Sequence, residues 1–488
     1  MNIRNKVYWG LGLVLFIISP LIFAQSIELS GGNTVGYWLF VDSLKEHIED
    51  KLKLSFTYNN ITLRGLFFFW QPSLPNQKRL QYIDYNIEYA NEPINIIYGT
   101  YYTTFGRGLV LNQFLDEDFK TDNSIYGAKA TFKMFNNELS ALFGKPRNIF
   151  FEENAYKIKN DTTDQIRGIN LETKLPLPDI IGLNIGGRYV RYNRRTDFNA
   201  RAFTELFGGN IEFTFGAYQG YFEYARHLGC RPGVGGRLTG TGLLFSSNLT
   251  FSGLGLAFQI MSYDTIGFGG LGYRYNEPPT PIKSGISVNR GMNEFGFGTS
   301  INYSATDFLN FEGNYNSLKT HAKTEGILEQ IFKAKLNAVE NLEITGLIER
   351  TVKDKIELPV LKKTEMKPSV EATYNFEEFF LDGSYEHNFI SADTSKYYEH
   401  AFSVSIGKSE LFQFTLRYER RNRIPNWLTS KLGTEKSWPM AELSLDITNK
   451  HNLRVRVGGE KGGLVCSGGV CRFEEPFKGV KLVLTSIF

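Results

Sequence analysis

KLKLSFTY, at residues 51–58, alternates polar and apolar side chains at every position. A period of two is that of a β-strand, whose successive side chains point to opposite faces, and it differs from the 3.6-residue period of a helix. The same alternation recurs in YIDYNIEY at 82–89, FQFTLRY at 412–418 and ELSLDI at 442–447. Because polar or charged residues occupy every second position, one face of each strand must contact water. The sequence therefore predicts an all-β protein.

The strands of a soluble β-sandwich also alternate polar and apolar residues, but their apolar face is inside the protein. The lengths of the connections between strands distinguish such a sandwich from a membrane barrel. Short turns alternate along the chain with long polar connections, the arrangement of an outer-membrane barrel with periplasmic turns and extracellular loops. We predict a closed antiparallel transmembrane β-barrel of about 24 strands, within a range of roughly 22 to 26. It begins with a strand near 32–40, continues through eleven hairpins and ends with one final strand. The predicted short turns are 59–60, 135–138, 251–253, 304–307, 376–378 and 448–451, and the long connections are 71–81, 112–124, 145–165, 193–206, 227–241, 263–291, 352–365, 420–436 and 459–476.

The N-terminal segment has the features of a secretory signal peptide. Arg4 and Lys6 precede an apolar stretch from Val7 to Phe23, and the small residue Ala24 follows. A retained transmembrane helix is the alternative, but the run is short and no stop-transfer segment follows it. We expect a signal peptide at 1–24, a barrel domain at 25–488, and integral location in the outer membrane.

The last strand alternates Val480, Leu482 and Leu484 with polar positions and ends at Phe488. Outer-membrane barrels commonly end in such a stripe, which their assembly machinery reads, so Phe488 is the expected assembly signal. Outer-membrane lipid and the barrel assembly machinery are the expected partners. The formal net charge of +3 gives no sign of nucleic-acid binding.

The three Cys residues permit a disulfide without making disulfides the framework of the fold. Cys466 and Cys471 lie in the Gly-rich CSGGVC segment, and we interpret them as a local disulfide. Zinc binding is the alternative, but no second Cys pair or His pair accompanies them. Cys230, assigned to another long loop, is left as a free thiol.

Charged residues fall in two settings. Asp116, Glu117, Asp118 and Asp122 form an acidic outer loop, which we interpret as solvated rather than as a calcium site because the spacing lacks a dedicated calcium-binding pattern. On the water-facing side of predicted strands lie residues expected to line the lumen and to set ion preference in a pore, namely Lys51, Lys53, Glu442, Asp446, Arg454 and Arg456.

No enzyme signature accompanies these features. The six His residues are scattered singly, without metal-ligand pairs, a nucleophile elbow or a phosphate loop. We predict no catalytic site, no metal site and no cofactor.

Several segments resemble a family of large, uncharacterised outer-membrane β-barrel proteins known only as a domain of unknown function. The likeness spans most of the mature chain, and its Cys-containing ending is the most specific part. It implies a barrel in the outer membrane of a Gram-negative bacterium and carries no assigned activity. The segments that carry it are 101–109 with the acidic loop that follows, 208–212, 275–279, 289–291, and 462–472 continuing through Pro476 to Phe488.

The predicted function is that of a channel or uptake protein, because a barrel of about 24 strands encloses a lumen wider than its side chains can fill. A bare hole of that size would leak, and the chain leaves no room for a separate N-terminal plug domain. The lumen must then be narrowed by long loops folding inward, with 263–291 and 145–165 as the predicted segments, or by a collapsed cross-section or a partner. The alternative function is a non-conducting scaffold or conduit for a surface or secretion partner protein.

Overall fold

A computed structural model describes the chain from residue 27 to residue 488 with short gaps. The predicted signal peptide at 1–24 lies outside the described residues. Within the described part, no helix has the length and the apolar character needed to cross a membrane. The gaps are 42–44, 72–78, 118–119, 153–154, 160–163, 179, 196–200, 232–235, 268, 271–272, 284, 286, 290, 356–359, 394, 425–434, 468–469 and 475.

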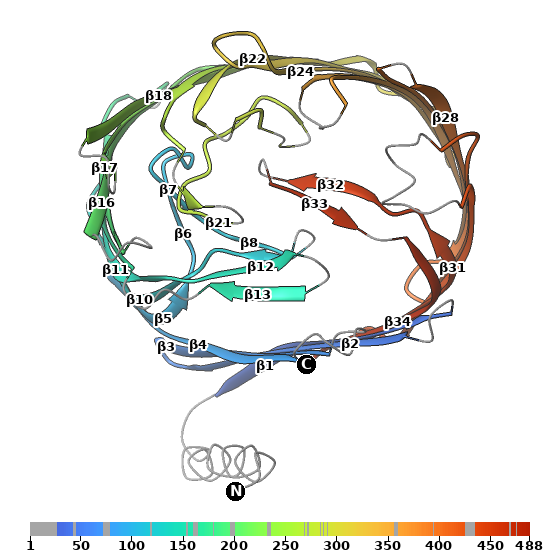
Figure 1. The fold of residues 1–488 in the computed structure, drawn as a ribbon, viewed down its shortest axis with the longest axis horizontal. Helices are drawn as coiled ribbons and strands as arrows, with labels where there is room; N and C mark the ends of the chain where they lie inside the picture. Colours follow the sequence, from blue (N-terminus) through green and yellow to red (C-terminus); the bar gives the residue numbers. More distant parts are fainter. Residues whose placement is uncertain are drawn as a thin grey trace, which may run out of the picture.

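A 24-stranded antiparallel sheet closes on itself into a barrel, as the ring in Figure 1 shows. Each strand pairs with the next along the ring, and β1 closes the circle on β34, with Tyr37 opposite Leu482. The predicted closed barrel of about 24 strands is confirmed. Its strands are β1 Glu28–Phe40, β2 Lys45–Tyr58, β3 Ile61–Gln71, β4 Leu80–Asn91, β5 Ile94–Tyr101, β10 Ile125–Met134, β11 Asn137–Pro146, β14 Gln165–Leu175, β15 Ile181–Arg195, β16 Arg201–Phe215, β17 Tyr218–Arg231, β18 Gly236–Phe251, β19 Leu254–Asp264, β22 Asn293–Thr306, β23 Leu309–Lys319, β24 Gly326–Val339, β25 Leu342–Asp354, β26 Lys362–Phe376, β27 Phe379–Ala392, β28 Ser395–Lys408, β29 Phe412–Arg421, β30 Ser437–Thr448, β31 His451–Glu460 and β34 Phe477–Ile487.

The outer surface of this ring is apolar because every second side chain of each strand points outward. On β4, Ile83, Tyr85 and Ile87 are exposed, whereas Asp84 between them is buried on the inner side. On β29, Leu416 is likewise exposed at 52%. Apolar side chains this exposed, all around a closed sheet, are stable only against lipid, so the wall spans a membrane.

Short turns, most of them two residues long, join the strands at the end of the barrel where β1 begins and β34 ends. Asn59, Phe135 and Glu377 have positive φ angles of 51°, 53° and 55° there. Positive φ matches the twist of a tight hairpin, and short turns of this kind face the periplasm in such barrels. Phe488 lies at the same end, where its backbone exchanges hydrogen bonds with Gly31 across the seam. Its role as an assembly signal stays a prediction.

The wall strands extend further toward the opposite, extracellular end than the sequence pattern indicated. Cys230 was assigned to a long loop, but it lies in β17 opposite Arg237 of β18. Pro368 and Pro439 lie within β26 and β30. The β26–β27 ladder skips Pro368, because proline has no N–H to donate.

In the described residues, ten short strands lie in the connections at the extracellular end. They form a four-stranded sheet of β8, β9, β12 and β13 and three two-stranded ribbons. In the view of Figure 1, down the barrel, these strands fall within the outline of the ring. Their bounds are β6 Thr103–Phe105, β7 Leu111–Gln113, β8 Leu115–Asp116, β9 Thr121–Asp122, β12 Asn148–Glu152, β13 Ala155–Lys159, β20 Gly269–Gly270, β21 Tyr273–Arg274, β32 Gly463–Ser467 and β33 Val470–Glu474.

Candidate functional site in the barrel lumen

Three connections fold into the lumen and pack against one part of the wall. We call the described residues of 102–124, 148–159 and 265–292 the lumen plug. In Figure 1 its strands lie inside the ring on the side of β10 to β18, and the hairpin β32–β33 enters from the side of β28 to β31. The predicted inward folding of 263–291 and 145–165 is confirmed for their described residues.

Hydrogen bonds join the first and third segments of the plug. Asn276 is fully buried, and its Nδ2 donates to the carbonyl oxygens of Leu109 at 2.7 Å and Ile266 at 2.8 Å. The backbone N–H of Glu277 donates to the carbonyl of Gly108 at 3.2 Å. Two of the segments that carry the family resemblance, 101–109 and 275–279, therefore meet inside the barrel.

An apolar core forms between the plug and the inward side chains of the wall. Burying one such side chain typically contributes about 1.5–3 kcal/mol, so the plug is a packed part of the fold rather than a loose loop. The inner face that the sequence predicted to be wet is dry along this part of the wall. The core residues are Tyr101, Phe105, Leu109, Val110, Leu111, Ile125, Leu142, Ile166, Val190, Tyr192, Leu206, Tyr221, Ala225, Leu244, Met261, Tyr263, Ile266, Tyr275, Ile282, Leu318 and Ile327.

Glu223 on β17 holds the tip of the plug. Its fully buried carboxylate accepts hydrogen bonds from Arg188 Nη1 at 2.9 Å, from the backbone N–H of Arg107 at 2.9 Å, and from Tyr221 at 2.7 Å. The Arg107 guanidinium stacks on the Tyr221 ring at 3.9 Å and hydrogen-bonds Ser246 on β18. A buried carboxylate is stable only with such partners, so this cluster fixes the tip at one place on the wall.

Glycines make the close approach of plug and wall possible. Gly106 has a φ of +62°, and a Cβ at this position would overlap both the Arg188 guanidinium and the Glu223 carboxylate. On β16, a Cβ at Gly208 would come within 2.5 Å of the plug residue Val110. Gly208 belongs to another segment quoted for the family resemblance, and its role is to leave room for the plug.

Arg147 makes a second anchor between plug and wall. Its guanidinium pairs with Asp84 on β4, hydrogen-bonds Asp122 of the plug at 3.2 Å and contacts Ser124. Burial raises the pKa of Asp122, and the neighbouring Arg147 charge opposes this rise. The interpretation of the acidic residues as a solvated outer loop was therefore wrong for Asp122, which is buried in the lumen, whereas Glu117 is 45% exposed. Asp118 lies outside the described residues.

Lys51 and Lys53, two of the predicted lumen charges, point inward from β2 to the plug. Their Nζ atoms lie 3.5 Å and 2.7 Å from the two carboxylate oxygens of Glu117. Partial burial acts to raise the pKa of Glu117, but the hydrogen bond from Lys53 and the charge of Lys51 outweigh it and hold the pKa below its usual range. These lysines therefore hold the plug, and their part in setting ion preference stays a prediction.

The other four predicted lumen charges lie together on β30 and β31, opposite the plug. Glu442 pairs with Arg456 and lies 3.8 Å from Arg454, and Asp446 accepts a hydrogen bond from Asn452 at 2.8 Å. Arg456 also pairs with Glu460, which in turn pairs with Lys481 of β34. The sequence predicted these inward charges but not their pairing across strands.

More ion pairs continue this surface onto β25 to β29. Glu399 accepts from Arg421 at 2.6 Å and lies 2.9 Å from Lys461, which reaches it from the segment before β32. Burial acts to lower the pKa of Lys461, but Glu399 and Glu419 raise it above the usual lysine value. We call this surface the charged wall; it consists of Glu349, Lys367, Glu386, Glu399, Arg417, Glu419, Arg421, Glu442, Arg454, Arg456, Glu460, Lys461 and Lys481.

Cys466 and Cys471 lie opposite each other on β32 and β33. Opposed residues of an antiparallel pair have Cα atoms about 4.5–5.5 Å apart, inside the range that a disulfide spans. The backbone register is thus compatible with the predicted disulfide, which stays a prediction. Among the described residues, no group of three or more His, Cys, Asp or Glu side chains is arranged to hold a metal ion.

The plug segment 102–124 was the main feature that sequence reasoning missed. Its acidic residues indicated a solvated loop, yet Leu109, Val110 and Leu111 form an apolar run within it and are fully buried. Three apolar residues between Gly108 and Asn112 were the available signal. Tyr101, at the end of β5, is buried beneath the plug as well.

A family model covers most of the part of the chain that builds the plug. Residues 49–277 match DUF6029, a family of unknown function. The DUF6029 match begins in β2 and ends at Glu277, so it contains the plug segment 102–124 and the part of 265–292 that holds Asn276. No curated protein matches the chain in sequence.

Solved structures with a similar fold are large outer-membrane barrels. The siderophore receptor PirA from Pseudomonas aeruginosa is 9% identical, with 95% of this chain and 81% of that chain covered and a TM-score of 0.50. The P pilus usher PapC translocation pore is 8% identical, with 94% of this chain and 99% of that chain covered and a TM-score of 0.48. The ferric citrate transporter FecA in its unliganded form is 10% identical, with 94% of this chain and 79% of that chain covered and a TM-score of 0.47.

At 9% identity and a TM-score of 0.50, the likeness to PirA shows the fold alone. Together with the apolar outer surface, it confirms the prediction of an integral outer-membrane β-barrel. The resemblance to an uncharacterised family is supported over residues 49–277 by the DUF6029 match, and the segments at 289–291 and 462–488 lie outside that match.

Proposed function

We propose that this barrel is a channel or uptake protein whose solute path runs along the charged wall and beside the lumen plug. The supporting observation is that the two sides of the lumen differ in polarity. One part of the wall is sealed by an apolar core, whereas the opposite part carries ion pairs such as Arg456 with Glu442, which are partly exposed at 28% and 19%. The exposed part of these charged side chains contacts water, and water is what a polar solute needs to pass.

The charged wall favours small polar or zwitterionic solutes over ions of one sign. Acidic and basic side chains alternate across neighbouring strands, as in the sequence Glu442, Arg456, Glu460 and Lys481. A lumen lined this way offers both hydrogen-bond donors and acceptors without a strong net field. The predicted lumen charges enter this proposal as residues that line the path.

A cysteine-block experiment in planar bilayers tests the path. Ser444 lies between Glu442 and Asp446 on the inner side of β30, where it accepts a hydrogen bond from Asn452. We expect the protein to conduct in steps, and a thiol-reactive sulfonate added to Ser444→Cys to reduce each step by half or more. The unsubstituted protein treated in the same way is the baseline for the native cysteines.

Two matched cysteines locate the block. Val455→Cys on the outer side of β31 should conduct as before after treatment, and Ala225→Cys, whose site is fully buried beneath the plug, should not react. A conducting protein in which Ser444→Cys is modified without a change in current would contradict the proposed path. An electrically silent protein that co-purifies with one stoichiometric partner would instead favour the scaffold or conduit.

A further inference from the structure

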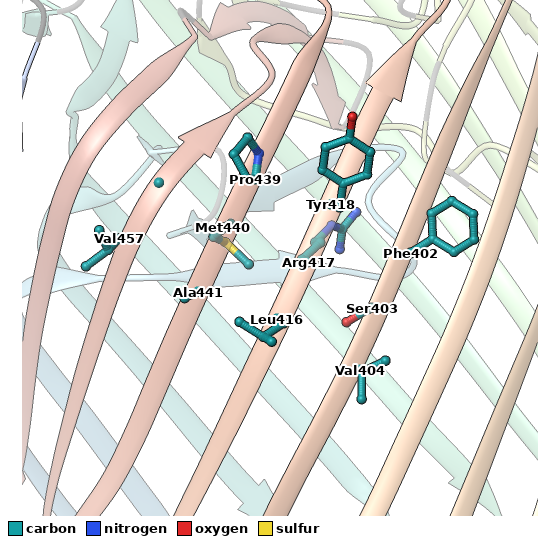
Figure 2. Close-up of a pocket in the computed structure, with 11 residues that line it drawn as sticks. Phe402, Ser403, Val404, Leu416, Arg417, Tyr418, Pro439, Met440, Ala441 and Val457 are labelled. Carbon is teal, nitrogen blue, oxygen red and sulfur yellow. The ribbon is translucent and has the colours of Figure 1, made fainter.

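A groove of about 530 Å³ crosses the outer surface of the barrel between β28 and β31. Its walls are side chains that point away from the lumen, as Figure 2 shows for Phe402, Val404, Leu416 and Tyr418. Phe402, Leu416 and Val457 are exposed at 49%, 52% and 50%. The groove is therefore a hollow in the lipid-facing surface and is separate from the lumen site.

Small outward residues on β30 produce this hollow. Ala441 and Pro439 occupy the outward positions of β30 between the larger side chains of β29 and β31. Ala441 pairs with Leu416 on one side and with Val457 on the other, so the surface dips at the alanine. A channel between rows of apolar side chains suits a flexible hydrocarbon chain.

The groove continues into a polar hollow toward the extracellular end of the barrel. This second hollow has a volume of about 420 Å³ and shares Pro439 and Gly458 with the groove. Lys436 and Lys478 line it, together with Glu435, whose carboxylate lies 3.2 Å from Lys478 Nζ. The two lysines exceed the single carboxylate in charge, so the hollow is cationic.

Arg420 adds a third positive charge beside this hollow. It is exposed, lies opposite Ser437 of β30, and follows Tyr418 by two residues, roughly 7 Å further toward the extracellular end. The parity of β29 places it on the same outer face as Leu416 and Tyr418. The outer surface of the wall thus changes from apolar to cationic toward the extracellular end of the barrel.

We propose that the groove and the hollow together bind a phosphate-bearing lipid of the outer leaflet. An acyl chain lies along Leu416 and Ala441, and the phosphate lies among Arg420, Lys436 and Lys478. Charge complementarity selects this occupant, because basic side chains next to apolar surface attract anionic lipids at about 1 kcal/mol for each charge. A second copy of the chain would bring the same positive charges together across the contact, which disfavours a symmetric dimer at this surface.

Native mass spectrometry of the delipidated protein in neutral detergent tests the proposal. The probes are a bis-phosphorylated lipid A, a phosphocholine lipid of similar chain length, and inorganic phosphate. We expect the unsubstituted protein to retain lipid A over the phosphocholine lipid. The triple variant Arg420→Gln, Lys436→Gln, Lys478→Gln should bind lipid A about 100-fold more weakly, at roughly five-fold for each charge removed.

Groove filling provides the second measurement. Ala441→Phe should weaken the binding of both lipids by about ten-fold or more. Ala130 is an outward alanine on β10 across the barrel, and Ala130→Phe should leave lipid binding unchanged. The charge control is Lys133→Gln, Lys174→Gln, Lys450→Gln at the short-turn end. Circular dichroism melting confirms that each variant is folded.

Three outcomes would overturn the proposal. The first is equal retention of lipid A by the triple variant and its charge control. The second is tight binding of inorganic phosphate with no preference for lipid A, which would make the hollow a simple anion site. The third is a dimer that Ala441→Phe dissociates, which would identify a second copy as the occupant.

Discussion

Arg188 on β15 donates a hydrogen bond to Glu223 on β17 at 2.9 Å, and the two side chains are completely buried beneath the plug tip at Gly106. Arg188 also pairs with Glu172 at 3.0 Å. The pair belongs to the wall, yet one oxygen of Glu223 remains for the backbone N–H of Arg107 in the plug. The stability of the plug in the lumen therefore depends on a charge pair that the wall supplies.

Glu223→Gln should loosen the plug without unfolding the barrel. Removing one partner of a buried ion pair typically costs about 3 kcal/mol or more, which corresponds to about a hundred-fold more frequent opening of the tip. Hydrogen exchange of residues 103–113 should become faster by that order, while the wall strands keep their protection. Glu212→Gln on β16, half-buried and away from the tip, is the control. Unchanged exchange at 103–113 in the Glu223 variant would show that the pair does not hold the plug.

Gly106→Ala should displace the plug tip, whereas Gly216→Ala should not. Both glycines have positive φ, at +62° and +54°, so each alanine costs roughly 1 kcal/mol of backbone strain. Only at Gly106 would the new Cβ overlap Arg188 and Glu223; at Gly216 it would meet nothing within 4 Å. Proteolysis of the plug segment in intact barrels measures the difference. Equal sensitivity of the two variants would contradict the assigned close approach.

The barrel wall could be predicted from the sequence because its signal is local. Leu52, Leu54 and Phe56 alternate with polar residues within one strand, and the turn residues Asn59 and Asn60 follow directly. A two-residue period needs no knowledge of distant neighbours. Strand number and closure follow from repeating this local pattern along the chain.

The plug could not be predicted in the same way because its partners are distant in the sequence. Asn276 bonds the carbonyl of Leu109 across 167 positions, and Arg107 reaches Glu223 across 116. The alternating pattern is also identical whether an inward residue such as Val190 contacts water or packs in an apolar core. Periodicity fixes which face a residue is on, but it does not reveal what covers that face.

Acid should release the Glu117 contact between the plug and β2. Because the pKa of Glu117 is lowered in the folded protein by Lys53 and Lys51, its ion pairs add stability above the unfolded carboxyl value near about 4.3. That stability is lost as the pH falls through the lower folded pKa. Hydrogen exchange of 115–117 measured from pH 7 to pH 3 should show local opening in the acid range. Glu117→Gln should open equally at all these pH values, and a pH response that persists in it would assign the effect to another group.

Thiol counting tests the Cys466–Cys471 disulfide. The opposed backbone positions on β32 and β33 favour a bond in an oxidising compartment. Alkylation of the denatured, unreduced protein should label Cys230 alone, and reduction should add two labels. Cys466→Ser should give two labels without reduction. Three labels in the unreduced protein purified from its own membrane would exclude the disulfide.

Arg456→Gln should shift the channel toward cations, because Glu442 and Glu460 lose the guanidinium that pairs with both. The uncompensated carboxylates raise the local concentration of cations and lower that of anions along the charged wall. Reversal potentials in a potassium chloride gradient measure this selectivity, and the shift should shrink at high salt, where surface charges are screened. Lys450→Gln, in the turn between β30 and β31, removes the same charge outside the proposed path and should leave selectivity unchanged. Equal shifts of the reversal potential in the two variants would mean that selectivity depends on the net charge of the protein. The charged wall would then not line the path.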